Sequence, residues 1–200
     1  MNKKELSIFY PATTNLPTEK RLIMSRIAFI APDKTLLENS RQIAQEIDCY
    51  NDTDFYYSQL NEAVTLAKSL ENTDIDVVIS RYGTAFMLLE ANLSIPVVEI
   101  MITGQDLAQA FYEAKKRTGL AHPRITYFAF SNMANDILRL SRILDIELRM
   151  VSLNDTQDIT AAIDQLPLDA ADIVMGGANA TAYAARRGFL TQIVQSGDCA

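Results

Sequence analysis

Polar residues and glycine gather where one apolar run gives way to a helical pattern. Ser80, Arg81, Gly83 and Thr84 follow the apolar residues 77–79. Glycine permits a left-handed backbone and close approach of a ligand, and the free N–H groups at the start of a helix favour anions. Arginine adds a planar fork that suits a carboxylate. This combination predicts a site for a carboxylate or phosphate, although the same residues could form an ordinary capped turn.

A second junction of the same kind follows the apolar run that ends at Met175. It carries Gly176 and Gly177, and short polar side chains follow two other apolar runs. All of these groups donate or accept hydrogen bonds, and none forms an acid–base pair, so we predict ligand binding and no catalytic residues. The ligand-binding residues that we predict are Ser80, Arg81, Tyr82, Gly83, Thr84, Ser131, Asn132, Gly176, Gly177 and Ser196.

Several other chemistries lack the residues that they need. The chain has no G-x-x-x-x-G-K-[ST] loop, so we expect no hydrolysis of nucleoside triphosphates. His122 is its one histidine, and the two cysteines, Cys49 and Cys199, lie far apart. Zinc and similar metals draw on several such ligands at short spacing. We therefore predict no metal and no cofactor, and we interpret His122 as a solvated loop residue.

The composition is that of an ordinary soluble protein. Of the 200 residues, 48% are hydrophobic and 22% are charged, and the net charge is −7 (18 basic minus 25 acidic residues). A negative surface repels phosphate backbones, so we expect no direct binding of nucleic acid. No apolar run approaches the ~20 residues of a membrane helix, and no secretory signal stands out. These features favour a cytoplasmic protein that does not bind membranes.

Strand and helix patterns alternate along the chain. This order is typical of βαβ crossovers and parallel sheets. We predict an α/β fold of two Rossmann-like lobes, each a small parallel sheet with helices on both faces and a ligand cleft between the lobes. One continuous sheet is the alternative. The predicted strands are 26–32, a short edge strand within 48–52, 75–80, 95–101, 124–130, 147–153, 171–177 and 190–197; the predicted helices are 33–47, 57–70, 84–92, 103–118, 135–146, 155–166 and 178–188.

The eight strands divide evenly near residue 103. We predict an N-terminal arm over residues 1–24, a first lobe over 25–103 and a second lobe over 104–200. Asp33 is the predicted N-cap of the first helix, and Thr103 with Asp106 forms the pattern of a capping box at the start of the second lobe. Glu99 ends a strand, where it could accept a ligand hydroxyl or pair with Arg81.

The central stretch resembles the N-terminal receptor domain of the propionate-catabolism activators, which are bacterial sigma-54-dependent transcription regulators. That family has an "SRGGTA" turn, then "IPVVEI", then a helix start with Gly-x-Asp-Leu. Residues 80–85 follow the turn except that Tyr82 replaces glycine, residues 95–100 match the strand, and Gly104, Asp106 and Leu107 match the helix start. The stretch 171–197 resembles the family's second glycine loop, with Ala178 where a third glycine is common.

The resemblance implies a ligand-sensing domain that does not act as an enzyme. It implies that a small organic acid, a 2-methylcitrate-like carboxylate, binds between the lobes. It also implies that the bound domain controls an AAA+ ATPase and DNA-binding module of a longer regulator, and a homodimer is possible. Two other functions stay open from the residues: a two-lobed enzyme of the isomerase or racemase kind, and a stand-alone solute-binding protein.

Overall fold

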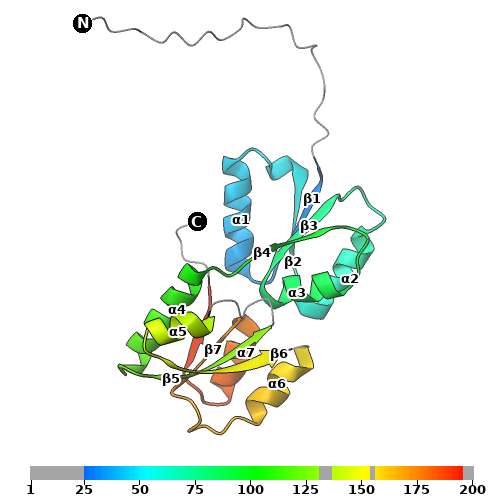
Figure 1. The fold of residues 1–200 in the computed structure, drawn as a ribbon. Helices are drawn as coiled ribbons and strands as arrows, with labels where there is room; N and C mark the ends of the chain where they lie inside the picture. Colours follow the sequence, from blue (N-terminus) through cyan, green and yellow to red (C-terminus); the bar gives the residue numbers. More distant parts are fainter. Residues whose placement is uncertain (1–24, 131–136, 154–155, 196–200) are drawn as a thin grey trace, which may run out of the picture.

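Two parallel sheets of four strands each form the framework of the molecule (Figure 1). The structure, a computed structural model, describes residues 25–130, 137–153 and 156–195. The sheets have the orders β2-β1-β3-β4 and β6-β5-β7-β8, so the two lobes share one topology. The strands are β1 (Ile27–Ala31), β2 (Thr53–Tyr57), β3 (Val77–Arg81), β4 (Val97–Ile100), β5 (Arg124–Phe130), β6 (Glu147–Leu153), β7 (Ile173–Gly176) and β8 (Thr191–Ile193).

Helices follow the strands and cover both faces of the first sheet. Side chains alternate between the faces along a strand. Ala28 and Ile30 of β1 therefore pack against one pair of helices, α2 and α3, while Phe29 and Ala31 pack against α1. The helices are α1 (Lys34–Glu46), α2 (Leu60–Leu70), α3 (Tyr82–Glu90), α4 (Gly104–Thr118), α5 (Ile137–Ile143), α6 (Thr156–Asp164) and α7 (Ala178–Arg186), and η1 (Tyr50–Asp52) is a short 3₁₀ turn.

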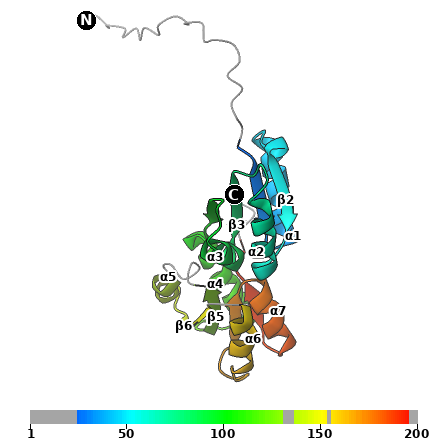
Figure 2. The ribbon, with the colours of Figure 1, turned by 90° about the vertical axis from the view of Figure 1, so that its right-hand side faces the viewer.

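The core of the second lobe is larger and reaches across to the first. It centres on Phe111 of α4 and the buried central strands β5 and β7. Partly buried side chains of the first lobe also pack against it, including Phe86, whose ring centroid lies 5.3 Å from that of Phe130. The lobes lie one above the other in both views (Figures 1 and 2). Apolar contacts of this kind help to join the two lobes.

The predicted α/β fold of two parallel-sheet lobes is confirmed, and so are several helix ends. Asp33 caps α1 by accepting a hydrogen bond from the Leu36 N–H at 2.8 Å. Thr103 and Asp106 form the predicted capping box of α4. The exact boundaries of the arm and the lobes remain a prediction, but α4 packs against α5, β7 and β8, all elements of the second lobe.

The boundary between the second strand and the second helix was wrongly predicted. Residues 50–52 form η1 instead of an edge strand, and β2 begins at Thr53. Tyr57 ends β2 rather than opening a helix, because it pairs with Ala31 of β1 and aromatic residues favour extended backbone. Helix α2 begins only at Leu60. The predicted ends of the last strand also differ, since β8 spans only Thr191–Ile193.

Candidate functional site

A cleft lies between the lobes at the carboxyl ends of the strands, where ligands bind in parallel α/β folds. Its cavity volume is ≈ 60 Å³. Seven residues of the first lobe and ten of the second line it. They are Pro32, Asp33, Gln59, Leu60, Tyr82, Gly83 and Thr84, and Phe128, Phe130, Leu153, Ile159, Gly177, Ala178, Asn179, Ala180, Ile193 and Gln195. Both walls therefore contribute residues from the junctions between strands and helices.

The junction of β3 and α3 supplies the centre of the first wall. Tyr82 has a left-handed backbone with φ of 59°. This conformation costs free energy for any residue that has a side chain, and it is found at functional sites. A Cβ added to Gly83 would overlap the ring of Phe130, so only glycine lets the two lobes approach this closely. Thr84 is buried, and its Oγ accepts a hydrogen bond from the Leu60 N–H at 3.1 Å. The starts of α2 and α3 are thereby held together.

Ser80 and Arg81 lie behind this wall and do not line the cleft. Ser80 is fully buried and donates a hydrogen bond to the Ile30 carbonyl at 2.7 Å. Arg81 is 4% exposed, its guanidinium carbon lies 4.7 Å from the centre of the Tyr82 ring, and its Nη2 donates to Asp106 Oδ2 at 2.9 Å. The role of both residues in binding a ligand remains a prediction.

The ion pair between Arg81 and Asp106 joins the two lobes. Arg81 ends β3 of the first sheet, whereas Asp106 belongs to α4, which packs on the second. Asp106 Oδ2 also accepts a hydrogen bond from the Thr103 N–H at 2.8 Å, as part of the capping box. The Arg81 Nε–H has no hydrogen-bond partner among the described residues. Glu99 was the partner considered for Arg81 from the sequence, whereas the structure places Asp106 beside Nη2.

The junction of β7 and α7 forms part of the second wall. Gly177 lines the cleft and has open space where a side chain would stand. Gly176 is buried in the sheet, and a Cβ there would lie 2.8 Å from the Phe128 carbonyl oxygen. Of the other predicted residues, Ser131, Asn132 and Ser196 lie outside the described part of the chain. The structure therefore brings Tyr82, Gly83, Thr84 and Gly177 together at the cleft.

Sequence reasoning missed most of the apolar lining of the cleft. Leu60 opens α2 with φ of 49°, and Phe130 ends β5 facing Gly83. Neither residue carries a polar group, so a search for hydrogen-bonding side chains could not select them. Their one signal was position, because each stands at the carboxyl end of a strand or the start of a helix.

The electrostatic character of the cleft comes mainly from backbone groups. Helices α3 and α7 begin there without a side-chain hydrogen bond from the N-cap residue, so their first N–H groups lie at the site with the positive end of the helix dipole. The first N–H of α2, by contrast, is bound to Thr84 Oγ. Among the lining residues that the structure describes, none is a lysine, arginine or histidine. In β5, burial raises the pKa of Tyr127, with Tyr82 as a smaller cause, so this phenol stays neutral.

Within residues 25–130, 137–153 and 156–195, no three histidine, cysteine or acidic side chains come together as a metal site would require. In the same residues, no helix combines the length and the apolar character needed to cross a membrane.

Comparisons with known proteins agree with this architecture. Residues 48–200 match the family described as "Propionate catabolism activator". The crystal structure of an NtrC family transcriptional regulator from Clostridium acetobutylicum superposes with a TM-score of 0.74 at 23% identity, over 88% of this chain and 90% of that one. At this identity the similarity shows the shared fold.

Other solved structures are more distant. The ABC domain in complex with L-Trp from Streptococcus pneumonia has a TM-score of 0.48 at 13% identity, over 81% of this chain and 68% of that one. An extracellular ligand-binding receptor from Rhodopseudomonas palustris HaA2 has a TM-score of 0.41 at 14% identity, over 84% and 59%. No curated protein sequence matches the chain.

Proposed function

This chain belongs to the propionate catabolism activator family, and from that premise we propose that it senses a small organic acid bound between its two lobes. As a member of the family it is a regulatory sensory domain. The observation that carries the proposal is the cleft itself, which takes Tyr82, Gly83 and Thr84 from one lobe and Gly177 from the other. The family resemblance makes a 2-methylcitrate-like carboxylate the first effector to test.

The proposed contacts follow from the geometry of the two walls. Tyr82, Gly83, Thr84 and Gly177 would touch the ligand directly. Ser80, Arg81 and Gly176 would support these contacts from behind the walls. Ser131, Asn132 and Ser196, which lie outside the described residues, are further proposed contacts. The uncapped starts of α3 and α7 offer N–H groups to a carboxylate. These groups bind and orient a ligand but supply no acid–base pair, which supports a sensor rather than an enzyme.

Signalling would use the connection between the lobes as a hinge. β4 ends at Ile100 and α4 begins at Gly104, where an added Cβ would meet open space. A ligand that touches both walls binds the closed arrangement better than an open one, and only that difference can shift the equilibrium. In a longer cytoplasmic regulator, the shift would control an AAA+ ATPase and its DNA-binding module. This chain would take no direct part in binding DNA, and it could act as a homodimer.

The proposal is tested by ligand binding to the whole chain. Thermal unfolding is followed with increasing 2-methylcitrate, citrate and smaller carboxylates, and binding is measured by calorimetry. A binder should raise the melting temperature in proportion to the logarithm of its concentration. Gly177→Leu, which fills the cleft, should abolish the effect, whereas Gly177→Ala should keep most of it. A folded chain that no organic acid stabilises would contradict the proposal.

A further inference from the structure

We propose that a second copy of this chain binds along the free edge of β2, so that the first-lobe sheets of two copies join into one. Among the described strands, β2 pairs only with β1, and it is the outermost strand of its sheet. It stands at the outer margin of the first lobe (Figure 2). This inference gives a homodimer its interface and does not depend on the organic acid proposed above.

The free side of β2 carries backbone groups that can pair with another strand. The N–H and C=O groups of successive residues point to opposite sides of a strand. The N–H of Ser58, just past β2, donates to the Ala31 carbonyl of β1 at 3.1 Å. Thr53, Phe55 and Tyr57 therefore direct their backbone groups away from β1. An edge of this kind is a template for a further strand.

An open groove follows this edge. It is lined by four consecutive residues of β2 and by one residue each of α1 and η1, namely Thr53, Asp54, Phe55, Tyr56, Arg41 and Tyr50. Side chains of consecutive strand residues alternate between the two faces of a sheet, so residues 53–56 can line one groove only at the edge of the strand. The groove therefore has the place and the direction of an added strand.

Aromatic side chains gather beside the groove. The ring centroid of Phe55 lies 5.4 Å from that of Tyr50 and 6.2 Å from that of Phe29, and the guanidinium carbon of Arg41 lies 5.8 Å from the Phe55 ring. Tyr50 and Tyr57 remain 40% and 51% exposed. Tyrosine, phenylalanine and arginine are enriched in protein interfaces, because their large surfaces gain free energy when a partner covers them.

The equivalent edge of the second lobe is built differently. β6 has the place of β2 in the same strand order, and its residues 148–152 pair with β5 as residues 53–57 pair with β1. Residues 148–152 include no aromatic residue, and β6 exposes the charged residues Glu147 and Arg149. Charges along an edge strand oppose pairing with another chain. The shared fold does not require the aromatic edge of β2, which supports a role in binding a partner.

Two copies of β2 fit each other in one antiparallel register. When Phe55 of each copy faces Phe55 of the other, Thr53 faces Tyr57 and all of β2 overlaps. The residues that direct their backbone groups outward then face one another, and they can exchange about six hydrogen bonds. The edge is therefore complementary to itself.

Charge favours the same register. Asp54 is the one charged residue of β2, and it is paired with Arg26 at 3.0 Å. With Phe55 on the symmetry axis, each Asp54 faces Tyr56 of the other copy. A shift that placed Asp54 on the axis would set two carboxylates against each other, which is unfavourable, and it would also shorten the overlap.

Sedimentation of the whole chain tests the proposal. Two short strands make an interface at the weak end of the range, so we expect dimers at about 0.1 mM. Tyr57→Lys places a charge on this edge, and Ser152→Lys places the same charge at the equivalent exposed position of β6. Tyr57→Lys should weaken dimerisation at least about tenfold, and Ser152→Lys should leave it unchanged. A monomer at about 1 mM, or equal effects of both variants, would overturn the proposal.

Disulfide formation tests the register. In a chain whose Cys49 and Cys199 are replaced by alanine, Phe55→Cys should form a cross-linked dimer on oxidation, because Cα atoms of such a facing pair lie about 5.5 Å apart. Tyr57→Cys is the control, since residue 57 of the two copies would lie about 13 Å apart, beyond the reach of a disulfide. Cross-linking of Tyr57→Cys in preference to Phe55→Cys would contradict this pairing.

A shortened chain tests whether another segment of the same molecule occupies the edge. Removal of residues 1–24 should leave the dimerisation constant unchanged. Dimers that form only after this removal would show that residues 1–24 cover β2 in the whole chain, and would overturn the proposal.

Discussion

The two junctions that face the cleft occupy the same place in their lobes but are built differently. Ser80 is the fourth residue of β3 and pairs with Ile30, and Gly176 is the fourth residue of β7 and pairs with Phe128. Ser80 uses its side chain to donate to the paired carbonyl at 2.7 Å. At Gly176 the paired carbonyl lies so close that a side chain has no room. At this position the first lobe has a side chain that makes a hydrogen bond, whereas in the second lobe the backbone of the neighbouring strand leaves no space for a side chain.

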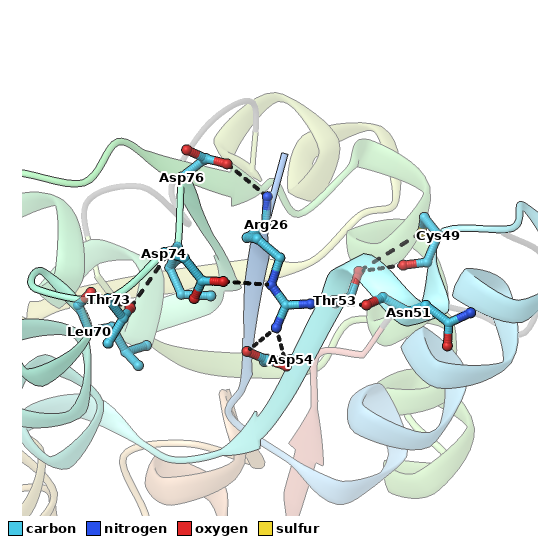
Figure 3. A network of polar contacts seen from close by, with 10 residues as sticks. Arg26, Cys49, Asn51, Thr53, Asp54, Leu70, Thr73, Asp74 and Asp76 are labelled. Atoms are coloured by element: carbon cyan, nitrogen blue, oxygen red, sulfur yellow. Dashed lines mark hydrogen bonds and ion pairs between the residues drawn. The ribbon is translucent and has the colours of Figure 1, made fainter. Parts of the chain in front are cut away.

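The amino ends of the strands, opposite the cleft, are by contrast alike in the two lobes. Arg26 precedes β1, and its backbone N–H donates to Asp76 at 2.8 Å, while its side chain contacts Asp54 and Asp74 (Figure 3). In the second lobe the backbone N–H of Arg124 donates to Asp172 at 2.7 Å in the equivalent place. The arrangement at the amino ends, which only holds strands together, is repeated in the two lobes, whereas the arrangement at the carboxyl ends beside the cleft differs. This contrast supports the proposal that a ligand binds at the cleft.

The largest difference between the junctions should appear at the residue before each helix. Arg81 precedes α3 and Gly177 precedes α7. Arg81→Ala leaves the carboxylate of Asp106 buried without its partner, which should cost about 3–5 kcal/mol of unfolding free energy. Gly177→Ala meets open space at a φ of −73° and should change stability by less than about 0.5 kcal/mol. Chemical denaturation measures both values.

A second variant separates lost charge from lost packing. Asp106→Asn in the Arg81→Ala background removes the orphaned charge while leaving an acceptor for the Thr103 N–H. It should recover part of the lost stability. If Arg81→Ala alone unfolds at the same denaturant concentration as the unaltered chain, the ion pair does not hold the lobes together.

Substitutions at the equivalent positions Ser80 and Gly176 should lower the free energy of unfolding by different amounts. Gly176→Ala places a Cβ against the Phe128 carbonyl oxygen, which belongs to rigid backbone, and should cost about 2–3 kcal/mol. Ser80→Ala removes one buried hydrogen bond, at a cost of about 1 kcal/mol. Equal costs in equilibrium unfolding would mean that the two positions are not built differently.

Gly83→Ala should act on the contact between the lobes. The new Cβ overlaps the ring of Phe130, so either the ring turns or the lobes move apart, at a cost of about 1–2 kcal/mol. Small-angle scattering distinguishes these responses, because separation of the lobes raises the radius of gyration. Gly104→Ala, where a Cβ meets open space, is the control and should leave the scattering unchanged. A larger change in the radius of gyration for Gly104→Ala than for Gly83→Ala would show that the overlap with Phe130 does not explain the result.

The smallest effect concerns stability in acid, at the amino ends of the strands where the two lobes are alike. Hydrogen bonds from the side chain and backbone of Arg124 hold the pKa of Asp172 below its ordinary value. A lowered pKa contributes stability above the pKa of the unfolded chain, and that contribution is lost as the pH falls through the folded value. Asp172→Asn should therefore flatten the loss of stability below about pH 4. If the melting temperature of Asp172→Asn falls with decreasing pH as steeply as that of the unaltered chain, the pairing of Asp172 with Arg124 does not contribute to acid stability.

The fold was predictable because its signals are local. Alternating apolar runs and helical patterns fixed the order of elements, and Asp33 and the Thr103–Asp106 capping box bond only within their own turns. Tyr57 was misassigned because its strand depends on pairing with β1, which no local pattern reports.

The site was less predictable because it depends on contacts between distant segments. The sequence marks Arg81 and Gly83 as unusual residues in a turn. It does not reveal that Asp106 neutralises the first or that Phe130 lies against the second. Both partners come from the other lobe, so the same residue types that suggest an anion site also serve to join the lobes.

The ion pair across the lobes also bears on how the chain folds during synthesis. Arg81 leaves the ribosome 25 residues ahead of Asp106, its only described counter-ion. Until the start of α4 has emerged, the first lobe must keep Arg81 hydrated and its interior incomplete, because burying a lone guanidinium is costly. Vectorial folding therefore cannot finish one lobe and then begin the next. A nascent chain arrested before Asp106 should remain sensitive to protease, whereas one extended through α4 should gain protection in its first half.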